Sequence, residues 1–145
     1  MSAAPDANDA ERSAVRVAFE AADRACAFGP SFFLGQLGRF VRDHCPEPEE
    51  HLPMVQIRLA DGQTLDLCHI IGVSARWVML AVRAARHQND MAIEIVPFEM
   101  VRGVRIVPHH SEGAMAGFSQ MRAPTIITAE TLVERALSPR MTDPR

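Results

Sequence analysis

Apolar and polar residues alternate along the middle of the chain, and a period of two predicts β-strands. The pattern is clearest in residues 54–60, where Val55, Ile57 and Leu59 alternate with polar neighbours. Asp61-Gly62 follows, a dipeptide typical of a tight hairpin turn. Further alternating stretches, separated by turns and a polar loop, continue to residue 107. The predicted strands are residues 54–60, 64–73, 76–83, 91–96 and 100–107.

The residues before these strands follow a helical period instead. In residues 9–27, five apolar side chains recur at steps of three and four and so share one face. These are Val15, Ala18, Phe19, Ala22 and Cys26. Asn8 is expected to cap this helix. A second helix is predicted over residues 31–45, with Ser31 as its cap and its end at Cys45, because the next residue is a proline.

The chain has 145 residues, the size of one ordinary domain. Its first residues are small and polar and are expected to be disordered, and the stretch after Pro108 predicts a loop or tail. Within that tail, residues 125–127 could form an edge strand, and residues 129–137 have the apolar spacing of a short helix. The expected units are residues 1–8, the helical segment 9–45, the β-rich segment 54–107 and the tail 108–145.

Composition narrows the class of protein. Hydrophobic residues make up 48% of the chain and charged residues 23%, which is typical of a globular domain. The first ten residues carry two aspartates and no basic residue, unlike a secretory signal, so we expect a cytoplasmic protein. All 15 basic residues are arginine, a bias we attribute to a GC-rich bacterial genome. The net charge of −3 argues against a protein that coats nucleic acid, but a local arginine patch remains open.

Five short strands after two helices predict an α+β, mainly β, fold: a strongly bent antiparallel barrel with a short C-terminal helix. Residues 31–107 resemble the Sm-like (LSm) family of small SH3-like barrels, which includes bacterial RNA chaperones. The stretch VQIRLADGQTLDLCHIIGVSARWVMLAV is similar to the family's first motif, and IEIVPFEMVRGVRI to its second. The resemblance implies a helix lying on the barrel, RNA binding by two loops, and rings joined through the fourth and fifth strands.

The sequence departs from that family in its RNA-contacting loops. Ser74 stands where the family has an aspartate, and Val78 where it has a base-reading asparagine. The second loop keeps Arg102-Gly103 but lacks the following acidic residue, and the glycine expected midway along the second strand is replaced. The ring contact of the family implies edge positions for three apolar residues. These are Val96, Met100 and Val104.

The candidate binding residues lie in those two loops. Trp77 beside Arg76 could stack on a base, with Arg102 and Arg105 holding phosphate and Ser74 completing the first loop. The simpler interpretation, which we favour, places Trp77 in the barrel interior and the arginines in solvent, because aromatic residues at strand spacing usually pack.

No catalytic or metal site is expected. His109-His110 would point to opposite sides of a strand, and no third ligand follows. The alternation puts His69 on the apolar face of its strand, so the neighbouring Cys68 cannot bond to it as a catalytic pair. The three cysteines include no CxxC pair, which argues against a disulfide framework or a thiolate zinc site. We therefore expect no cofactor and no enzyme activity.

Two functional hypotheses follow. The favoured one is a non-enzymatic binding or adaptor module that associates with itself or with another protein, without a membrane role. The alternative is an RNA-binding Sm-like protein; an enzyme with an unrecognised site is a third and weaker one. The missing asparagine and the acidic net charge favour the adaptor.

Overall fold

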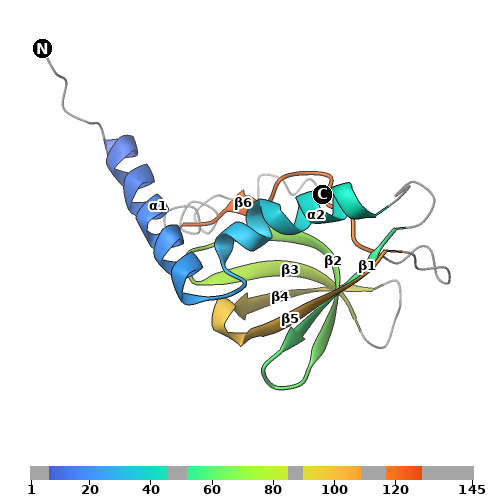
Figure 1. Ribbon diagram of the computed structural model, residues 1–145. Helices are drawn as coiled ribbons and strands as arrows, with labels where there is room; N and C mark the ends of the chain where they lie inside the picture. Colours follow the sequence, from blue (N-terminus) through green and yellow to red (C-terminus); the bar gives the residue numbers. More distant parts are fainter. Residues whose placement is uncertain (1–6, 46–51, 85–89, 109–116, 129–145) are drawn as a thin grey trace, which may run out of the picture.

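A computed structural model describes residues 7–45, 52–84, 90–108 and 117–128. The fold is α+β and mainly β, with two helical segments and one sheet; the second segment lies on the sheet, whereas the first extends away from it (Figure 1). The helical elements are α1 (Ala7–Ala25), the π-helical turn η1 (Phe32–Gln36), α2 (Leu37–His44) and the 3-10 turn η2 (Phe98–Met100). The strands are β1 (Met54–Leu59), β2 (Thr64–Val73), β3 (Trp77–Arg83), β4 (Met91–Pro97), β5 (Val101–Val107) and β6 (Thr125–Ile126).

The two helical segments are confirmed, but both begin differently from the prediction. α1 starts at Ala7, so Asn8 lies inside the helix rather than capping it. Ser31 has helical backbone angles and makes no cap hydrogen bond. Instead its N–H donates to Asp23 Oδ1 at 2.9 Å, and its hydroxyl donates to Asp23 Oδ2. This carboxylate ties the start of the second helical segment to the end of α1.

The sheet has the strand order β4-β3-β2-β1-β5, antiparallel throughout, with β6 added in parallel to β2. All five predicted strands are present, and so is the short edge strand predicted near residue 125. The predicted barrel closure is not observed, because β4 and β5 end the strand order and no ladder joins them in the described chain. Proline at the end of β4 and the turn η2 carry the chain away from a hairpin, and β5 pairs with β1 instead.

Strand β2 is bent by two irregularities in its pairing with β3. The register shifts between Leu67 and His69 and again between Ile70 and Gly72. Each such bulge adds a residue to one strand and reverses which face the following side chains occupy. Ile70 is therefore buried, whereas His69 is only half-buried. The prediction that His69 shares the apolar face with Leu65 and Leu67 was wrong for this reason.

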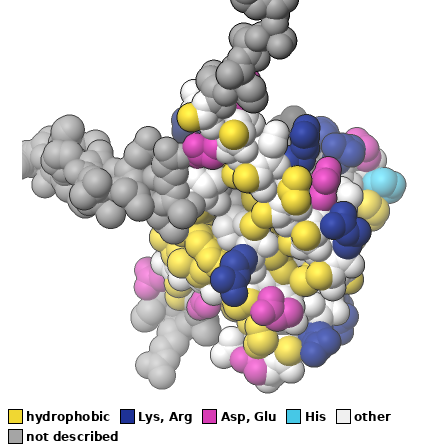
Figure 2. Space-filling view, turned by 90° about the vertical axis from the view of Figure 1, so that its left-hand side faces the viewer, with side chains coloured by type: hydrophobic (Ala, Val, Ile, Leu, Met, Phe, Trp, Pro, Cys, Tyr) yellow, Lys and Arg dark blue, Asp and Glu magenta, His cyan; other side chains and the backbone are white. Residues whose placement is uncertain are grey.

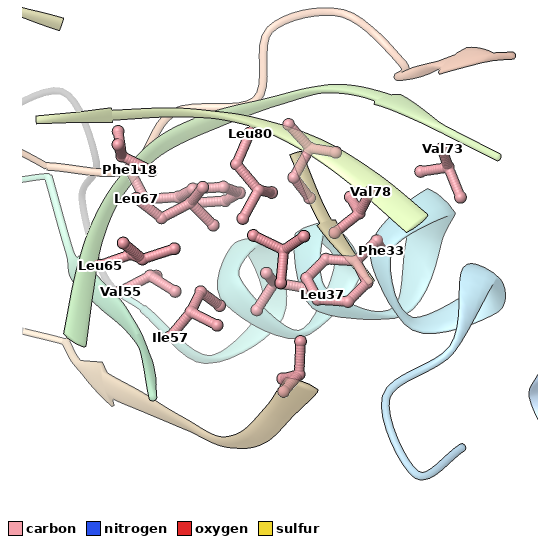
Figure 3. Packing of buried hydrophobic residues seen from close by; sticks show 14 of the residues in the cluster. Phe33, Leu37, Val55, Ile57, Leu65, Leu67, Val73, Val78, Leu80 and Phe118 are labelled. Atoms are coloured by element: carbon pink, nitrogen blue, oxygen red, sulfur yellow. The ribbon is translucent and has the colours of Figure 1, made fainter. Parts of the chain in front are cut away.

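The hydrophobic core lies between the concave side of the sheet and the second helical segment (Figure 3). Phe33 and Leu37 project from that segment toward Ile57 of β1 and Val78 and Leu80 of β3. Phe33 stacks on Phe98 of η2, with ring centroids 6.1 Å apart. The aromatic residues of this largely aliphatic interior are therefore phenylalanines.

Trp77 does not occupy the place we predicted for it. The alternation along β3 is confirmed, but its core-facing side chains are Val78, Leu80 and Val82. Trp77 lies half-buried on the opposite side of the strand, opposite Pro97 of β4. The interpretation that placed this indole in the interior is therefore wrong, and Trp77 remains available at the surface.

The stretch predicted as a loop or tail contains an ordered piece of the core. Residues 117–128, here called the return segment, run along β2. Phe118 is 2% exposed and lies beside Leu67 (Figure 3). The side-chain amide of Gln120 makes two hydrogen bonds to the backbone of Ile70. Its oxygen accepts from the Ile70 N–H at 2.8 Å, and its NH₂ group donates to the Ile70 carbonyl at 2.9 Å. The predicted helix 129–137 lies outside the described residues.

The return segment should contribute strongly to stability. Replacing Phe118 by alanine leaves a cavity beside Leu67, and such a change lowers the free energy of unfolding by about 3–5 kcal/mol. The matched control is Met121→Ala in the same segment, because Met121 is 88% exposed and should change stability little. Urea denaturation of both variants measures the difference. Equal stability of the two variants would show that the segment is not part of the core.

Candidate binding surfaces

The turn between β2 and β3 is built around the side chain of Ser74. Its hydroxyl oxygen accepts from the N–H of Arg76 at 3.0 Å and of Trp77 at 2.9 Å, and the hydroxyl donates to the Trp77 carbonyl at 3.0 Å. Ser74 is itself buried. All of the hydrogen-bonding capacity of this hydroxyl goes to the turn, so Ser74 is a structural residue here rather than a ligand contact.

Trp77 and Arg76 lie next to a shallow groove of about 280 Å³. One wall comes from Val15 and Phe19 of α1, and the other from this turn and Ile127 of the return segment. Figure 2 shows this side of the molecule, on which hydrophobic side chains lie among scattered basic and acidic ones. The groove is mainly apolar, and Arg76 is the one charged residue among the described residues that line it.

The second pair of candidate residues lies on another part of the sheet. Arg102 and Arg105 are exposed side chains of β5, and Arg105 is paired with Gln56 of β1. The turn that carries Arg76 is joined to η2, since the N–H of Phe98 donates to the Arg76 carbonyl at 3.2 Å. Arg102 and Arg105 follow η2 in β5, which lies three places away from β3 in the sheet order. The five predicted residues thus belong to two elements, with Ser74, Arg76 and Trp77 at the β2–β3 turn and the other two on β5.

Three of the exposed large apolar side chains of the described residues lie on the outer side of β4, which sequence reasoning missed. Met91, Ile93 and Ile95 are 58%, 64% and 53% exposed. They face the same way as Met79 and Ala81 of β3, with which Ile95 and Ile93 are paired. β4 ends the sheet, so its outer edge has no strand partner among the described residues.

The residues predicted for this edge point elsewhere. Val96 is buried in the core, and Met100 and Val104 are half-buried and pack against it. The alternation of Ile93, Glu94 and Ile95 already places the two isoleucines on the face opposite to Val96. The sequence of β4 alone does not tell which of the two faces is buried, because that depends on the neighbouring strand.

The described residues show no catalytic or metal-binding arrangement. No group of three or more His, Cys, Asp or Glu side chains in these residues could hold a metal ion. Burial raises the pKa of the Cys45 thiol, which keeps it protonated and unlike a nucleophile. Cys26, Cys45 and Cys68 are all free cysteines. His109 and His110 lie outside the described residues.

Comparison with known proteins adds no family to this description. The chain matches no protein-family model, and no curated protein or solved structure is significantly similar to it. No helix in the described ranges is long and apolar enough to cross a membrane. The resemblance to Sm-like barrels therefore remains one of residues and spacing.

The role of Ser74 in the turn can be tested by Ser74→Ala. The substitution leaves the N–H groups of Arg76 and Trp77 without their acceptor, and we expect the free energy of unfolding to fall by about 1–2 kcal/mol. Ser119→Ala is the control, because the Ser119 hydroxyl makes no hydrogen bond to the part of the chain that the structure describes, and it should change stability by less than about 0.5 kcal/mol. If Ser74→Ala is as stable as the native chain, the turn does not need the Ser74 hydroxyl, and the structural role is contradicted.

Proposed function

We propose that this protein is a non-enzymatic binding module, an adaptor on an Sm-like, open and strongly bent β-sheet, which associates with a second copy of itself through strand β4. The observation that carries the proposal is the combination of an unpaired strand edge with exposed apolar side chains on the same strand. Exposed, apolar edge strands template pairing with another strand, and natural proteins usually protect them with charges, prolines or bulges.

The sequence of β4 suits a two-fold antiparallel pair centred on Ile93. In that register Ile93 meets its own copy, and Met91 meets Ile95 of the partner, so the outer face pairs apolar residues only. Glu94 would then lie opposite Ala92 of the partner, so the only acidic side chain of the strand would not face its own copy. A register centred on Glu94 would place two carboxylates side by side, which is unfavourable.

The dimer should depend on the apolar side chains of β4. By light scattering after gel filtration, we expect the native chain to have twice the 16.0 kDa mass of one chain. Ile93→Lys places two positive charges at the two-fold axis and should give a monomer. Met121→Lys is the matched control, because it changes another exposed apolar residue away from the edge, and it should remain a dimer.

A native chain that elutes as a monomer at all concentrations would contradict self-association. A larger closed ring would instead support the pairing of β4 with β5 that the family resemblance implies. If the Ile93→Lys variant is folded and still dimeric, the two subunits associate through a surface other than β4.

RNA binding is the alternative function, and the exposed Arg76 beside the half-exposed Trp77 is the observation in its favour. Since the Ser74 hydroxyl is used by the turn, and Arg76 lies in that turn while Arg102 and Arg105 lie on β5, we expect no salt-sensitive binding of short single-stranded RNA at micromolar protein. Fluorescence anisotropy at two salt concentrations measures this. Tight binding that weakens with salt and is lost in Trp77→Ala would establish the RNA function in place of the adaptor.

A further inference from the structure

A cleft of about 510 Å³ separates α2 from the return segment, away from the surfaces described above. Its lining includes three arginines, Arg39 and Arg42 from α2 and Arg122 from the return segment, and no acidic side chain of the described residues. All three arginines are exposed. Among the described residues, no hydrogen bond or ion pair engages any of these guanidinium groups. Within the described part of the chain, the cleft therefore gathers three positive charges without an acidic partner.

Both walls of the cleft are held in place by the core. α2 is anchored by Leu37 and Val41, which are buried. The return segment is anchored by Phe118, and the amide of Gln120 donates at 2.7 Å to the backbone carbonyl of Arg122. The arginine backbones are thus fixed by contacts that the ligand would not have to supply, which lowers the entropic cost of binding.

Two positions in the helical wall are glycine although the packing of the described residues leaves room for a larger side chain. Glycine within a helix costs about 1 kcal/mol relative to alanine. At Gly72 and Gly117 an added Cβ would lie within 2.4 Å of another atom in the packed interior, so the glycine is required. At Gly38 an added Cβ would meet no atom of the described residues within 4 Å, and at Gly35 only Arg39 Nη2 at 3.7 Å. Both line the cleft, so the space left by their missing side chains is open to a ligand.

The helical wall is also irregular at this place. Gly35 lies in the π-helical turn η1, directly before α2. Such turns are rare and occur frequently at functional sites. The irregular turn, the two unexplained glycines and the three unpaired arginines all lie around one cleft, whereas the rest of the helix serves the core.

We propose that this cleft binds a small organic phosphate. The remaining wall is apolar, with Leu34, Leu52 and Met121 among its residues, and would contact the body of the ligand. The volume lies in the range of small-molecule sites. Guanidinium groups match both phosphate and carboxylate, but three of them fit the double charge of a phosphate monoester better than a single carboxylate.

Phenyl phosphate is a suitable probe, because it joins an apolar body to a doubly charged phosphate. We expect saturable shifts of the Gly35 and Gly38 amides in ¹H–¹⁵N NMR spectra of the full chain, with Kd about 1 mM for so small a ligand. Phenol, inorganic phosphate and benzoate should each bind at least about tenfold more weakly, since each lacks part of the match. Benzoate binding as well as phenyl phosphate would overturn the preference for phosphate.

The variants separate binding from folding. Arg39→Gln and Arg122→Gln should each weaken phenyl phosphate about three- to tenfold. Arg24→Gln on α1 is the control and should not, because Arg24 lies outside the cleft. Gly38→Leu should fill the cleft and abolish binding while the melting temperature stays equal or rises, since leucine favours the helix. A melting temperature that falls in Gly38→Leu would mean that the glycine serves the fold, which would overturn its role in the site.

Two results would overturn the site itself. One is the absence of saturable shifts at Gly35 and Gly38 up to about twenty times the expected Kd. The other concerns the acidic run Glu47, Glu49 and Glu50, which lies in the sequence between the cleft residues Arg42 and Leu52. If phenyl phosphate bound only after these three were replaced by glutamine, the chain's own carboxylates would be the natural partners of the arginines.

Discussion

A short, strongly bent sheet cannot bury its own concave side, and this constraint determines the rest of the structure. The five main strands end in β4 and β5 without a ladder between them, so the interior is not sealed by the strands alone. The side chains of Phe33 and Leu37 enter from one direction and Phe118 from another. Each of these three residues is at most 2% exposed. The second helical segment and the return segment are thus parts of the core rather than additions to a finished barrel.

The same constraint explains which surfaces remain free. The return segment covers β2 through β6 and the Gln120 hydrogen bonds, and α2 covers the concave side. The outer edge of β4 receives neither cover, and Met91, Ile93 and Ile95 remain exposed there. Between α2 and the return segment, the two covering elements do not meet, which leaves the arginine-lined cleft. The proposed self-association and the proposed phosphate site therefore arise at two different gaps in the covering of one sheet.

The presence of the strands, and the order of helices and strands along the chain, could be predicted from the sequence, because alternation and turn residues are local signals. The errors came where a distant residue decides the outcome. The bulges in β2 reversed the faces of His69 and Ile70. Gly72 was the available signal for the second bulge, whereas no residue type marks the first. Trp77 lies outside because it alternates with Val78 and Leu80, which take the inner face of β3. Phe118 lies in a stretch of small and polar residues with no periodic pattern, so its place in the core follows only from its contact with β2. Of the candidate residues, Arg76, Arg102 and Arg105 are exposed, in agreement with the interpretation that placed the arginines in solvent.

One nuclear Overhauser spectrum of the full chain tests the central claim most directly, namely that side chains of the covering elements, Phe33, Leu37 and Phe118, complete the core of an open sheet. The account predicts cross-peaks between the rings of Phe33 and Phe98, whose centroids are 6.1 Å apart, and between Phe118 and Leu67. It predicts no intramolecular backbone cross-peaks between β4 and β5. Cross-strand peaks between β4 and β5 within one chain, together with contacts of the Trp77 indole to Leu80 or Ile57, would show a closed barrel filled by tryptophan and contradict the account.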